Sequence, residues 1–566
     1  MNFMTHPLFT KHEATLSTAL KAIRERGYWS PFNEMPSPRV YGEHAASEGE
    51  AAFKALLNNH FDVDQPGSEG KVGKEASPFG FPLSVTYPKA NPDVLLQAAS
   101  LAQGTWRRAG PAAWAGVCLE ILTRLNTRSF EIAHSVMHTT GQAFMMAFQA
   151  GGPHAQDRAL EAVAYAWDEL KDIPETAYWE KPQGKNPPLS MEKRFTIVPR
   201  GIGLVIGCCT FPTWNSYPGL FADLATGNAV VVKPHPAAIL PLAITVRVAR
   251  EVLAEAGFDP NVVTLLATDP GDGEFMQKLV VRPEIRIIDF TGSTSNGDWI
   301  EQHALQAQVY TEKAGVNQIV IDSVEDMKSA ARNIAFSLSL YSGQMCTAPQ
   351  NIYVPKDGIQ TADGRISFDE VAGAIEQAVQ KLLGDPAKAV ELTGAIQNAG
   401  ILERIESARG CGEVLLDSRA ISHPSYPEAV VRTPIITKLD ASDEQKYLKE
   451  WFGPISFIVA TDSTEQSLEI AANAAASKGA LTLSVYSTDE AVVENAIEAS
   501  VEGRVALSIN LTGGVFVNQS AAFSDFHATG GNPAANASLT DAAFVANRFR
   551  VVQSRRHVQA RDSADS

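Results

Sequence analysis

Hydrophobic positions along the chain first favour helices and then alternate between short strands and helices. Leu16, Leu20 and Ile23 repeat at helical spacing, and a helical pattern continues over residues 91–170. From there apolar runs alternate with helical segments, and the runs predict strands over residues 204–209, 229–232, 262–266 and 285–290. Strands that alternate with helices are typical of a parallel sheet covered by helices on both faces.

A second alternation of the same kind covers residues 318–509, so the predicted fold class is α/β with two doubly wound parallel-sheet domains. Residues 65–88 are punctuated by Pro and Gly and predict an extended connector. The predicted organisation is an N-terminal helical extension with its connector, two α/β domains and a C-terminal segment. Their predicted ranges are residues 1–90, 91–311, 312–509 and 510–566.

The composition is that of an ordinary globular protein, with 566 residues, 45% hydrophobic and 20% charged. A formal net charge of -17 argues against nucleic acids and anionic membranes as partners. We find no secretory signal, and no apolar run approaches the roughly 20 residues that span a bilayer. Five scattered cysteines without zinc-ligand spacing indicate reduced thiols, so we predict a cytoplasmic protein.

Two glycine-containing segments are candidates for binding phosphate. Gly201, Gly203 and Gly207 miss the dinucleotide fingerprint by one residue and lie in an apolar run, which favours tight packing instead. Residues 290–297 follow a predicted strand and open a helix, where free N–H groups and the helix dipole favour a phosphate. An ordinary helix start with Ser293 as its N-cap gives the same pattern.

Three residues far apart in the chain supply complementary chemistry. Cys346 offers a thiol nucleophile, Glu312 a carboxylate base and Asn215 an amide donor for an oxyanion. Taken singly, each has an ordinary interpretation, as a buried cysteine, a surface carboxylate and a turn residue. Lys233, at the end of a predicted strand, either reaches a ribose or phosphate or is simply solvated.

Taken in order, six motifs resemble those of the aldehyde dehydrogenase superfamily, and flanking elements extend the resemblance from Asn91 to Arg550. The motifs are Trp214-Asn215, Val232-Lys233-Pro234, Phe290-Thr291-Gly292-Ser293, Glu312, Gly343-Gln344-x-Cys346 and Glu450-Trp451-Phe452-Gly453-Pro454. The resemblance implies oxidation of an aldehyde to a carboxylic acid with NAD or NADP as cofactor.

The resemblance also implies a role for each matching residue. Cys346 attacks the aldehyde to give a thiohemiacetal, and Asn215 with the Cys346 backbone N–H holds the developing oxyanion. Glu312 activates water to hydrolyse the resulting thioester and can also deprotonate the thiol. Lys233 and Glu450 hold the riboses, Ser293 the diphosphate, and Phe452 packs beside the nicotinamide ribose. The full set of expected cofactor contacts is Trp214, Lys233, His235, Gly292, Ser293, Glu450 and Phe452.

Family architecture assigns a function to each predicted region. Residues 91–311 would bind the cofactor and contain an oligomerisation strand near residues 180–200. Residues 312–509 would be catalytic, and residues 510–566 would form a substrate-entrance loop and an oligomerisation tail. The small oligomerisation arm of the family implies a homodimer or a dimer of dimers.

One departure from the family pattern concerns the choice of dinucleotide. Members that prefer NAD usually carry an acidic residue three positions after the lysine, where this chain has Pro236. A carboxylate there would repel a 2′-phosphate, and its absence removes that discrimination. With His235 nearby as a donor, the sequence favours NADP over NAD, unless Pro236 merely shapes the turn.

A second departure surrounds the carboxylate. Glu312-Lys313-Ala314-Gly315 replaces the more common Glu-Leu-Gly-Gly, so Lys313 and Ala314 are expected to alter the orientation or pKa of Glu312. The carboxylate itself is retained, and this favours hydrolytic release of the acyl group over transfer to coenzyme A.

Both ends of the chain resemble the phenylacetate-degradation (PaaN-type) subgroup, on the segments 26–32, 516–520 and 523–533. The resemblance implies a semialdehyde made by opening an aromatic ring carried on coenzyme A, so the substrate is an aldehyde that is free or coenzyme-A-linked. The alternatives are a broad-specificity enzyme for small free aldehydes and a non-catalytic fold relative. Asp525 and His527 lack a third ligand nearby, so no metal is predicted.

Overall fold

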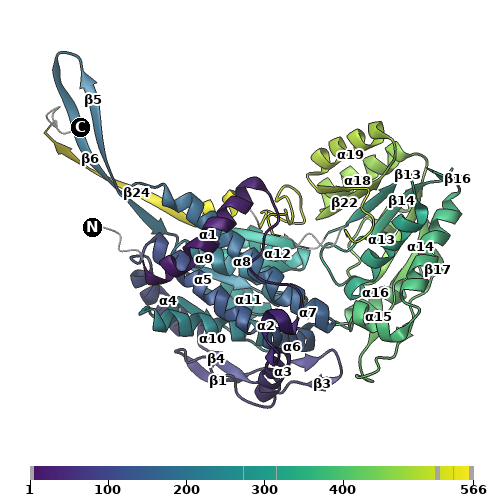
Figure 1. Ribbon diagram of the computed structural model, residues 1–566, viewed down its shortest axis with the longest axis horizontal. Coiled ribbons are helices and arrows are strands. Elements are labelled where there is room, and N and C mark those ends of the chain that lie inside the picture. The colour runs from purple at the N-terminus through teal and green to yellow at the C-terminus, as the bar shows by residue number, and fades with distance from the viewer. Residues whose placement is uncertain (1–5, 272, 314, 517–522, 540, 560–566) are drawn as a thin grey trace.

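The computed structural model describes residues 6–271, 273–313, 315–516, 523–539 and 541–559. Two α/β bodies lie side by side, and a long three-stranded arm projects from the first of them (Figure 1). Of the positions discussed above, Ala314 and residues 517–520 lie outside the described residues.

The first sheet has five parallel strands in the order β11-β10-β7-β8-β9. Their bounds are β7 Ile202–Ile206, β8 Ala229–Lys233, β9 Val263–Leu265, β10 Ile285–Gly292 and β11 Gln308–Lys313. The four strands predicted in this region are present. However, β7 ends at Ile206, so Cys208 and Cys209 lie in the following loop and not in the strand. The edge strand β11, whose sequence QVYTEK is largely polar, was not predicted.

Helices cover both faces of this sheet. Because neighbouring strand residues point to opposite sides, each strand contributes side chains to two apolar cores. In β8, Val230 and Val232 join one apolar core, and Ala229 and Val231 join another. No helix in the described part of the chain is long and apolar enough to cross a membrane. The helices of this body are α4 Pro92–Trp106, α5 Pro111–Thr127, α6 Ser129–Thr140, α7 Phe144–Gly151, α8 Pro153–Lys171, α9 Pro212–Ala225, α10 Leu240–Glu255, α11 Gly273–Val280 and α12 Thr294–His303.

The second sheet has seven strands in the order β17-β20-β21-β14-β12-β22-β23, parallel except for β17. Residues of β12 alternate between its two cores, Val320 on one side and Ile319 and Ile321 on the other. The doubly wound α/β fold is therefore confirmed in both bodies. Its main elements are β12 Gln318–Ile321, α13 Met327–Ser339, β14 Asn351–Pro355, α14 Phe368–Leu382, α15 Pro386–Thr393, α16 Gly400–Arg409, β17 Glu413–Leu416, β20 Ile435–Asp440, β21 Ile455–Thr461, α18 Thr464–Lys478, β22 Thr482–Tyr486, α19 Glu490–Gly503 and β23 Ala506–Ile509.

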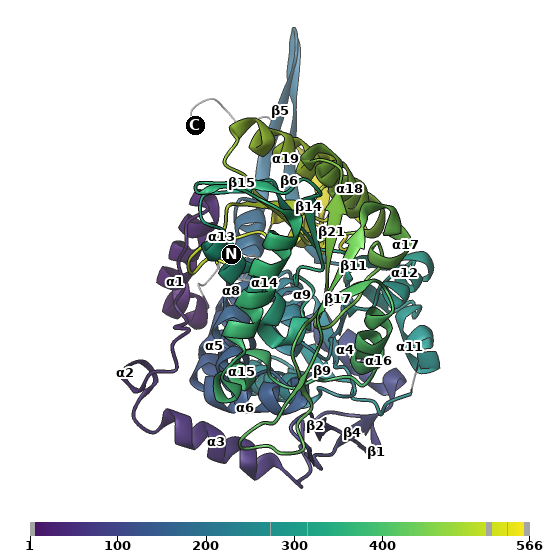
Figure 2. The same ribbon diagram turned by 90° about the vertical axis from the view of Figure 1, so that its right-hand side faces the viewer.

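The N-terminal region packs against the first body. Its elements are α1 Pro7–Glu25, α2 Pro38–Tyr41, α3 Ala45–Leu56, β1 Ser68–Val72, β2 Ala76–Ser77, β3 Phe81–Pro82 and β4 Tyr87–Ala90. The three helices follow one another down one side of the molecule (Figure 2). α1 lies close against α5, since a Cβ added at Gly116 would come within 2.4 Å of the Phe9 amide nitrogen. The predicted extended connector contains the short strands β1 to β4.

The arm consists of β5 Thr176–Gln183, β6 Asn186–Pro199 and β24 Phe549–Val558, paired antiparallel with β6 in the centre. A fully buried arginine, just before β24, holds the base of the arm on the first sheet. Arg548 pairs with Asp223 at 2.7 Å and with Asp289 at 2.6 Å. Gly219 leaves room for this network, because a Cβ there would lie 2.4 Å from Asp289 Cγ.

Replacing Arg548 with Met is expected to lower the free energy of unfolding by about 3–5 kcal/mol, because two buried carboxylates lose their partner. Chemical denaturation measures the difference. Arg550→Met is the matched control, since Arg550 is exposed two residues further along. Equal losses in the two variants would contradict the importance assigned to the buried network.

Candidate active site

Cys346 follows a turn with unusual backbone geometry. Tyr341, Ser342 and Gly343 all have positive φ, at 50°, 49° and 61°. For residues other than glycine this conformation costs about 1–2 kcal/mol each, so the surrounding structure must hold it. The Ser342 hydroxyl does so by donating to the carbonyl oxygen of Arg432 at 3.0 Å. The turn is thus fixed by contacts from distant parts of the chain.

The turn also lies tightly against the end of the sixth motif, residues 450–454. A Cβ added at Gly343 would come within 2.3 Å of the Gly453 carbonyl oxygen. On the other side, Asn317 donates its Nδ2 to the Cys346 carbonyl at 2.7 Å. These contacts fix the backbone of the cysteine and leave its thiol half-buried.

The three residues predicted to be catalytic lie together. Glu312 is the penultimate residue of strand β11, and its carboxylate is buried. Asn215, on α9, donates its Nδ2 to Glu312 Oε1 at 3.1 Å. Cys208 in turn donates its thiol to Asn215 Oδ1 at 3.6 Å and so fixes the orientation of the amide. The second N–H of the same amide group is a donor for an oxyanion.

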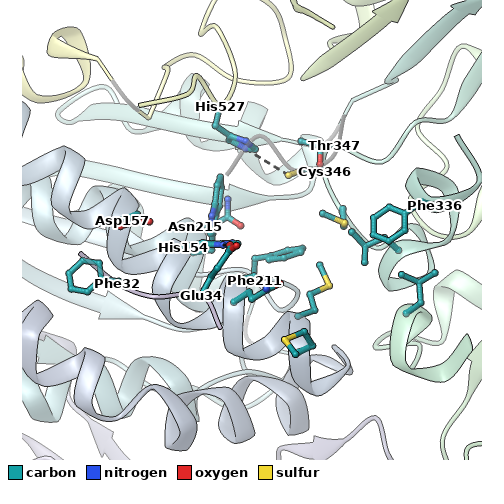
Figure 3. A pocket seen from close by; sticks show the side chains of 18 of the residues that line it. Phe32, Glu34, His154, Asp157, Phe211, Asn215, Phe336, Cys346, Thr347 and His527 are labelled. Carbon is teal, nitrogen blue, oxygen red and sulfur yellow. Dashed lines mark hydrogen bonds and ion pairs between the residues drawn. The ribbon is translucent and has the colours of Figure 1, made fainter. Parts of the chain in front are cut away.

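His527 is a member of this site that the sequence analysis did not identify. Its Nε2 lies 3.9 Å from Cys346 Sγ (Figure 3) and 3.1 Å from Glu312 Oε1. The edge-on ring of Trp214 packs against it, with centroids 4.4 Å apart. The sequence analysis considered His527 only beside Asp525. The fold supplies two further potential ligands, and the ligand atoms of Glu312, Cys346 and His527 lie within 4.8 Å of one another.

The electrostatics of the site favour a protonated Cys346 thiol and an ionised Glu312 carboxylate. Burial and the negative charge of Glu312 raise the pKa of the Cys346 thiol well above its usual value. Burial also raises the pKa of Glu312, but the positive charge and hydrogen bond of His527 outweigh burial and hold that pKa below its usual value. The carboxylate is therefore ionised, whereas the thiol needs help to lose its proton.

A cavity of about 540 Å³ opens beside Cys346 (Figure 3). Asn215, His527 and Trp214 line it close to the thiol. The N-terminal region contributes Tyr28, Phe32 and Glu34 to its wall, so this region closes one side of the cavity and does not lie apart from the site.

A second cavity, of about 300 Å³, also reaches Cys346 and Glu312. It contains residues that follow β7 and β10, the neighbouring strands at which the order of the first sheet reverses. Ligands of doubly wound sheets bind at such a reversal. Of the expected cofactor contacts, it is lined by Gly292, Ser293, Glu450 and Phe452.

The other three expected cofactor contacts lie elsewhere. Trp214 lines the larger cavity instead, because it sits on the turn of α9 that faces His527. Lys233 is buried at the end of β8, and its Nζ donates to the Pro234 carbonyl at 3.4 Å. His235 is exposed, and its Nδ1 accepts the Ala237 N–H at 3.1 Å.

Residues 86–535 match the model of the aldehyde dehydrogenase family. The chain belongs to that family. The resemblance drawn from the six motifs is therefore confirmed at the level of the family. A solved structure, an NAD-dependent aldehyde dehydrogenase from Burkholderia multivorans, is 72% identical in sequence, with a TM-score of 0.97 over 99% of this chain and 100% of that one.

Curated relatives of this aldehyde dehydrogenase are more distant. The 1-pyrroline-5-carboxylate dehydrogenase of Geobacillus thermodenitrificans (strain NG80-2) is 26% identical over 444 residues, 75% of this chain and 80% of that protein. A 1-pyrroline-5-carboxylate dehydrogenase structure from Thermus with bound NAD has a TM-score of 0.72 at 19% identity, covering 94% of this chain and 99% of that one. At that identity the likeness shows the fold alone. None of these names points to the phenylacetate-degradation subgroup.

The smaller cavity fits the dinucleotide that this family implies. Ser293 caps α12 by accepting the Asn296 N–H at 3.4 Å, and the N-terminus of a ten-residue helix favours a diphosphate. Glu450 supplies a carboxylate for ribose hydroxyls, and Phe452 an aromatic face.

Lys313, which departs from the usual family motif, extends its side chain toward helix α12 and not toward Cys346. Lys313 is buried, and its Nζ lies 2.8 Å from Asp298 Oδ1 and 3.1 Å from Glu301 Oε1, both on α12. Successive residues of a strand face opposite sides, so Glu312 enters the catalytic site while Lys313 binds the helix. The departure therefore ties the catalytic strand to the helix that Ser293 caps.

The variant Gly343→Ala is expected to destabilise the protein and to misplace Cys346, because the added methyl meets the Gly453 carbonyl. Gly257→Ala separates this clash from the cost of the backbone conformation alone. Gly257 also has positive φ, at 80°, but has open space around it, so we expect a loss of only about 1–2 kcal/mol there. Thermal denaturation and thiol labelling of Cys346 measure both effects. Similar behaviour of the two variants would contradict the close approach.

Proposed function

We propose that this aldehyde dehydrogenase oxidises an apolar semialdehyde, of the kind that ring opening in aromatic-acid breakdown produces, to the carboxylic acid. The semialdehyde carries a coenzyme A thioester at its far end and no free carboxylate. The observation that carries the proposal is the lining of the larger cavity, which combines apolar side chains with carboxylates. The apolar set includes Phe32, Met145, Met146, Phe336 and Leu340.

The charges of the lining support a substrate without a free carboxylate. Glu391 and Glu34 line the cavity, the latter 2.8 Å from His154 Nε2, and no Lys or Arg is among its described lining residues. Asp157 lines it too, but burial raises the pKa of its carboxyl group well above the usual value and favours the neutral form. A free carboxylate would be repelled by the glutamates, whereas a thioester group is itself uncharged and keeps the phosphates of coenzyme A at a distance. The 1-pyrroline-5-carboxylate named for the curated relatives carries such a carboxylate, so this lining favours a different substrate. A cavity of about 540 Å³ also exceeds what a small free aldehyde fills.

The residues of the site divide the chemistry between them. Cys346 Sγ attacks the carbonyl carbon to give a thiohemiacetal, whose oxyanion is held by an N–H of Asn215. A bound nicotinamide dinucleotide supplies the hydride acceptor. Glu312 then takes a proton from the water that hydrolyses the Cys346 thioester. Gly292, Ser293, Glu450 and Phe452 would hold the dinucleotide in the smaller cavity.

Both NAD and NADP fit this proposal, with NADP accepted because position 236 holds no carboxylate. The Burkholderia multivorans neighbour is described as NAD-dependent, which supports NAD. His235 is exposed beside Pro236, where its free Nε2 can face a 2′-phosphate.

The arm supports assembly of the enzyme from several copies of the chain. Its outer strands β5 and β24 are largely exposed and each pairs with β6 on one side only, within the described residues. Exposed strand edges are ready partners for another sheet. We infer that the arm joins subunits into a homodimer or a dimer of dimers.

The substrate is tested with one semialdehyde prepared both as its coenzyme A thioester and as its free acid. Reduction of NAD and NADP, followed by absorbance, is expected to be at least about tenfold more efficient for the thioester, equivalent to ~1.4 kcal/mol. Cys346→Ala is expected to abolish turnover of both. Preference for the free acid, or faster turnover of small free aldehydes, would overturn the proposed substrate and leave the reaction class intact.

The choice of dinucleotide is tested by Pro236→Glu. The new carboxylate is expected to lower kcat/KM with NADP by about tenfold, because like charges near the surface repel by roughly 1–4 kcal/mol, and to leave NAD little changed. Pro236→Ala is the control that removes the ring without adding charge. If the glutamate variant keeps the parent ratio of NADP to NAD efficiency, position 236 does not face the 2′-phosphate.

A further inference from the structure

The chemistry proposed above leaves one buried ionisable side chain of the site without a role. His527 is 3% exposed and lies between the nucleophile and the carboxylate, 3.9 Å from Cys346 Sγ and 3.1 Å from Glu312 Oε1. We propose that His527 is a further catalytic residue, whose imidazolium is the counter-charge that makes the Cys346 thiolate available. The inference deepens the proposed function but does not depend on which aldehyde is oxidised.

The loop that carries His527 is held in a costly conformation. Ser524 and Ala528, on either side of it, have positive φ at 69° and 62°. Two such residues together cost about 2–4 kcal/mol, so other contacts must offset this strain. A placement maintained at this cost favours a functional role for the residue at its centre.

Helix α8 provides the first of these contacts. Arg158 is fully buried, and its Nη1 donates to the Asp525 carbonyl at 2.8 Å and to Glu161 Oε2 at 2.9 Å. The other carboxylate oxygen of Glu161 accepts the backbone N–H of Ser524. One buried ion pair therefore holds two peptide groups, 523–524 and 525–526, just before His527.

Helix α1 and the residue that ends it provide the second set. The Ser524 hydroxyl donates to the Ala22 carbonyl at 3.2 Å. The guanidinium of Arg26 lies 4.2 Å from the centroid of the Phe526 ring. The N-terminal region thus supports the loop as well as lining the cavity.

Charged and titratable groups face His527 from several elements. Glu312 faces it from β11 and Cys346 from the loop after α13, while Arg158 lies behind the Trp214 ring at 5.6 Å. Further charged or titratable groups line the same cavity, namely Tyr28, Glu34, His154, Asp157 and Glu391. An opposite charge within about 4–6 Å stabilises an ionised group, so an imidazolium at His527 stabilises a thiolate at Cys346.

The proposed step moves one proton from Cys346 to Glu312 and leaves the negative charge on sulfur beside His527. The S–H bond of Cys346 breaks and its proton forms an O–H bond with Glu312 Oε2, which accepts no hydrogen bond in this structure. The electron pair stays on Sγ, and the Nε2–H of His527 turns from Glu312 Oε1 toward the thiolate. Sγ then attacks the aldehyde carbon. Glu312 passes its proton to solvent before it acts on water.

The experiment measures alkylation of Cys346 and needs neither aldehyde nor dinucleotide, so its outcome is independent of the proposed substrate. The full-length protein, His527→Gln and His527→Phe are treated with neutral iodoacetamide and with anionic iodoacetate from pH 5 to 10 in the presence of EDTA. Labelled peptides are identified by mass spectrometry, with Cys346→Ala as the blank. His138→Gln is the matched control, because His138 is equally buried and contacts Ser77 far from the site.

We expect both His527 variants to alkylate at least about tenfold more slowly at pH 7, because loss of a nearby opposite charge raises the pKa of a thiol further. The ratio of iodoacetate to iodoacetamide rates is expected to fall in both variants. In the unaltered protein that ratio, divided by the ratio for a free thiol such as glutathione, should exceed one at pH 7, a result that does not require a variant to fold. Unchanged rates and ratios in variants with parental thermal midpoints, or a normalised ratio of one or less in the unaltered protein, would overturn the proposal.

Discussion

The site depends on how the exposed edge of β11 is paired. This strand lies at the end of the first sheet, so one row of its backbone groups has no strand partner. Residues 534–536 supply that partner. The Lys313 N–H donates to the Ala534 carbonyl at 2.6 Å, and Thr311 exchanges two hydrogen bonds with Asn536, at 2.8 and 3.1 Å. Because buried backbone groups must be paired, this contact determines where the preceding loop runs and places His527 over Glu312.

The alternation of side chains along the same strand links the two cavities. Glu312 faces the nucleophile, and the next residue, Lys313, pairs with two carboxylates of α12. Gly297 makes room for this lysine, since a Cβ there would lie 2.6 Å from Lys313 Cδ. A shift of β11 by one residue would exchange the two side chains and disrupt both cavities, because every side chain would move to the other face. The register of one short strand therefore fixes the relation between the carboxylate and the cofactor side of the site.

Local patterns of the sequence were sufficient for the fold and the family, but not for the details of the site. Short apolar runs located β7, β8 and β10, and the six motifs identified the family. The pattern did not reveal β11, which is largely polar, nor the left-handed turn at Tyr341 and Ser342, which only distant contacts hold in place. His527 was not recognised because its partners lie about 180 and 215 residues away, and only the edge pairing of β11 brings them together. The walls of the larger cavity limit which substrate fits. Those parts of the walls that come from the α1–α2 segment, α7 and α13 contain none of the six motifs.

The order in which the chain is synthesised gives the edge pairing a further consequence. Cys346 and Glu312 leave the ribosome well before residues 534–536, and both sheets can form without that final segment. His527 and the segment that pairs with β11 are therefore among the last parts of the site to be synthesised. The three side chains at the centre of the site can come together only when the chain is almost complete.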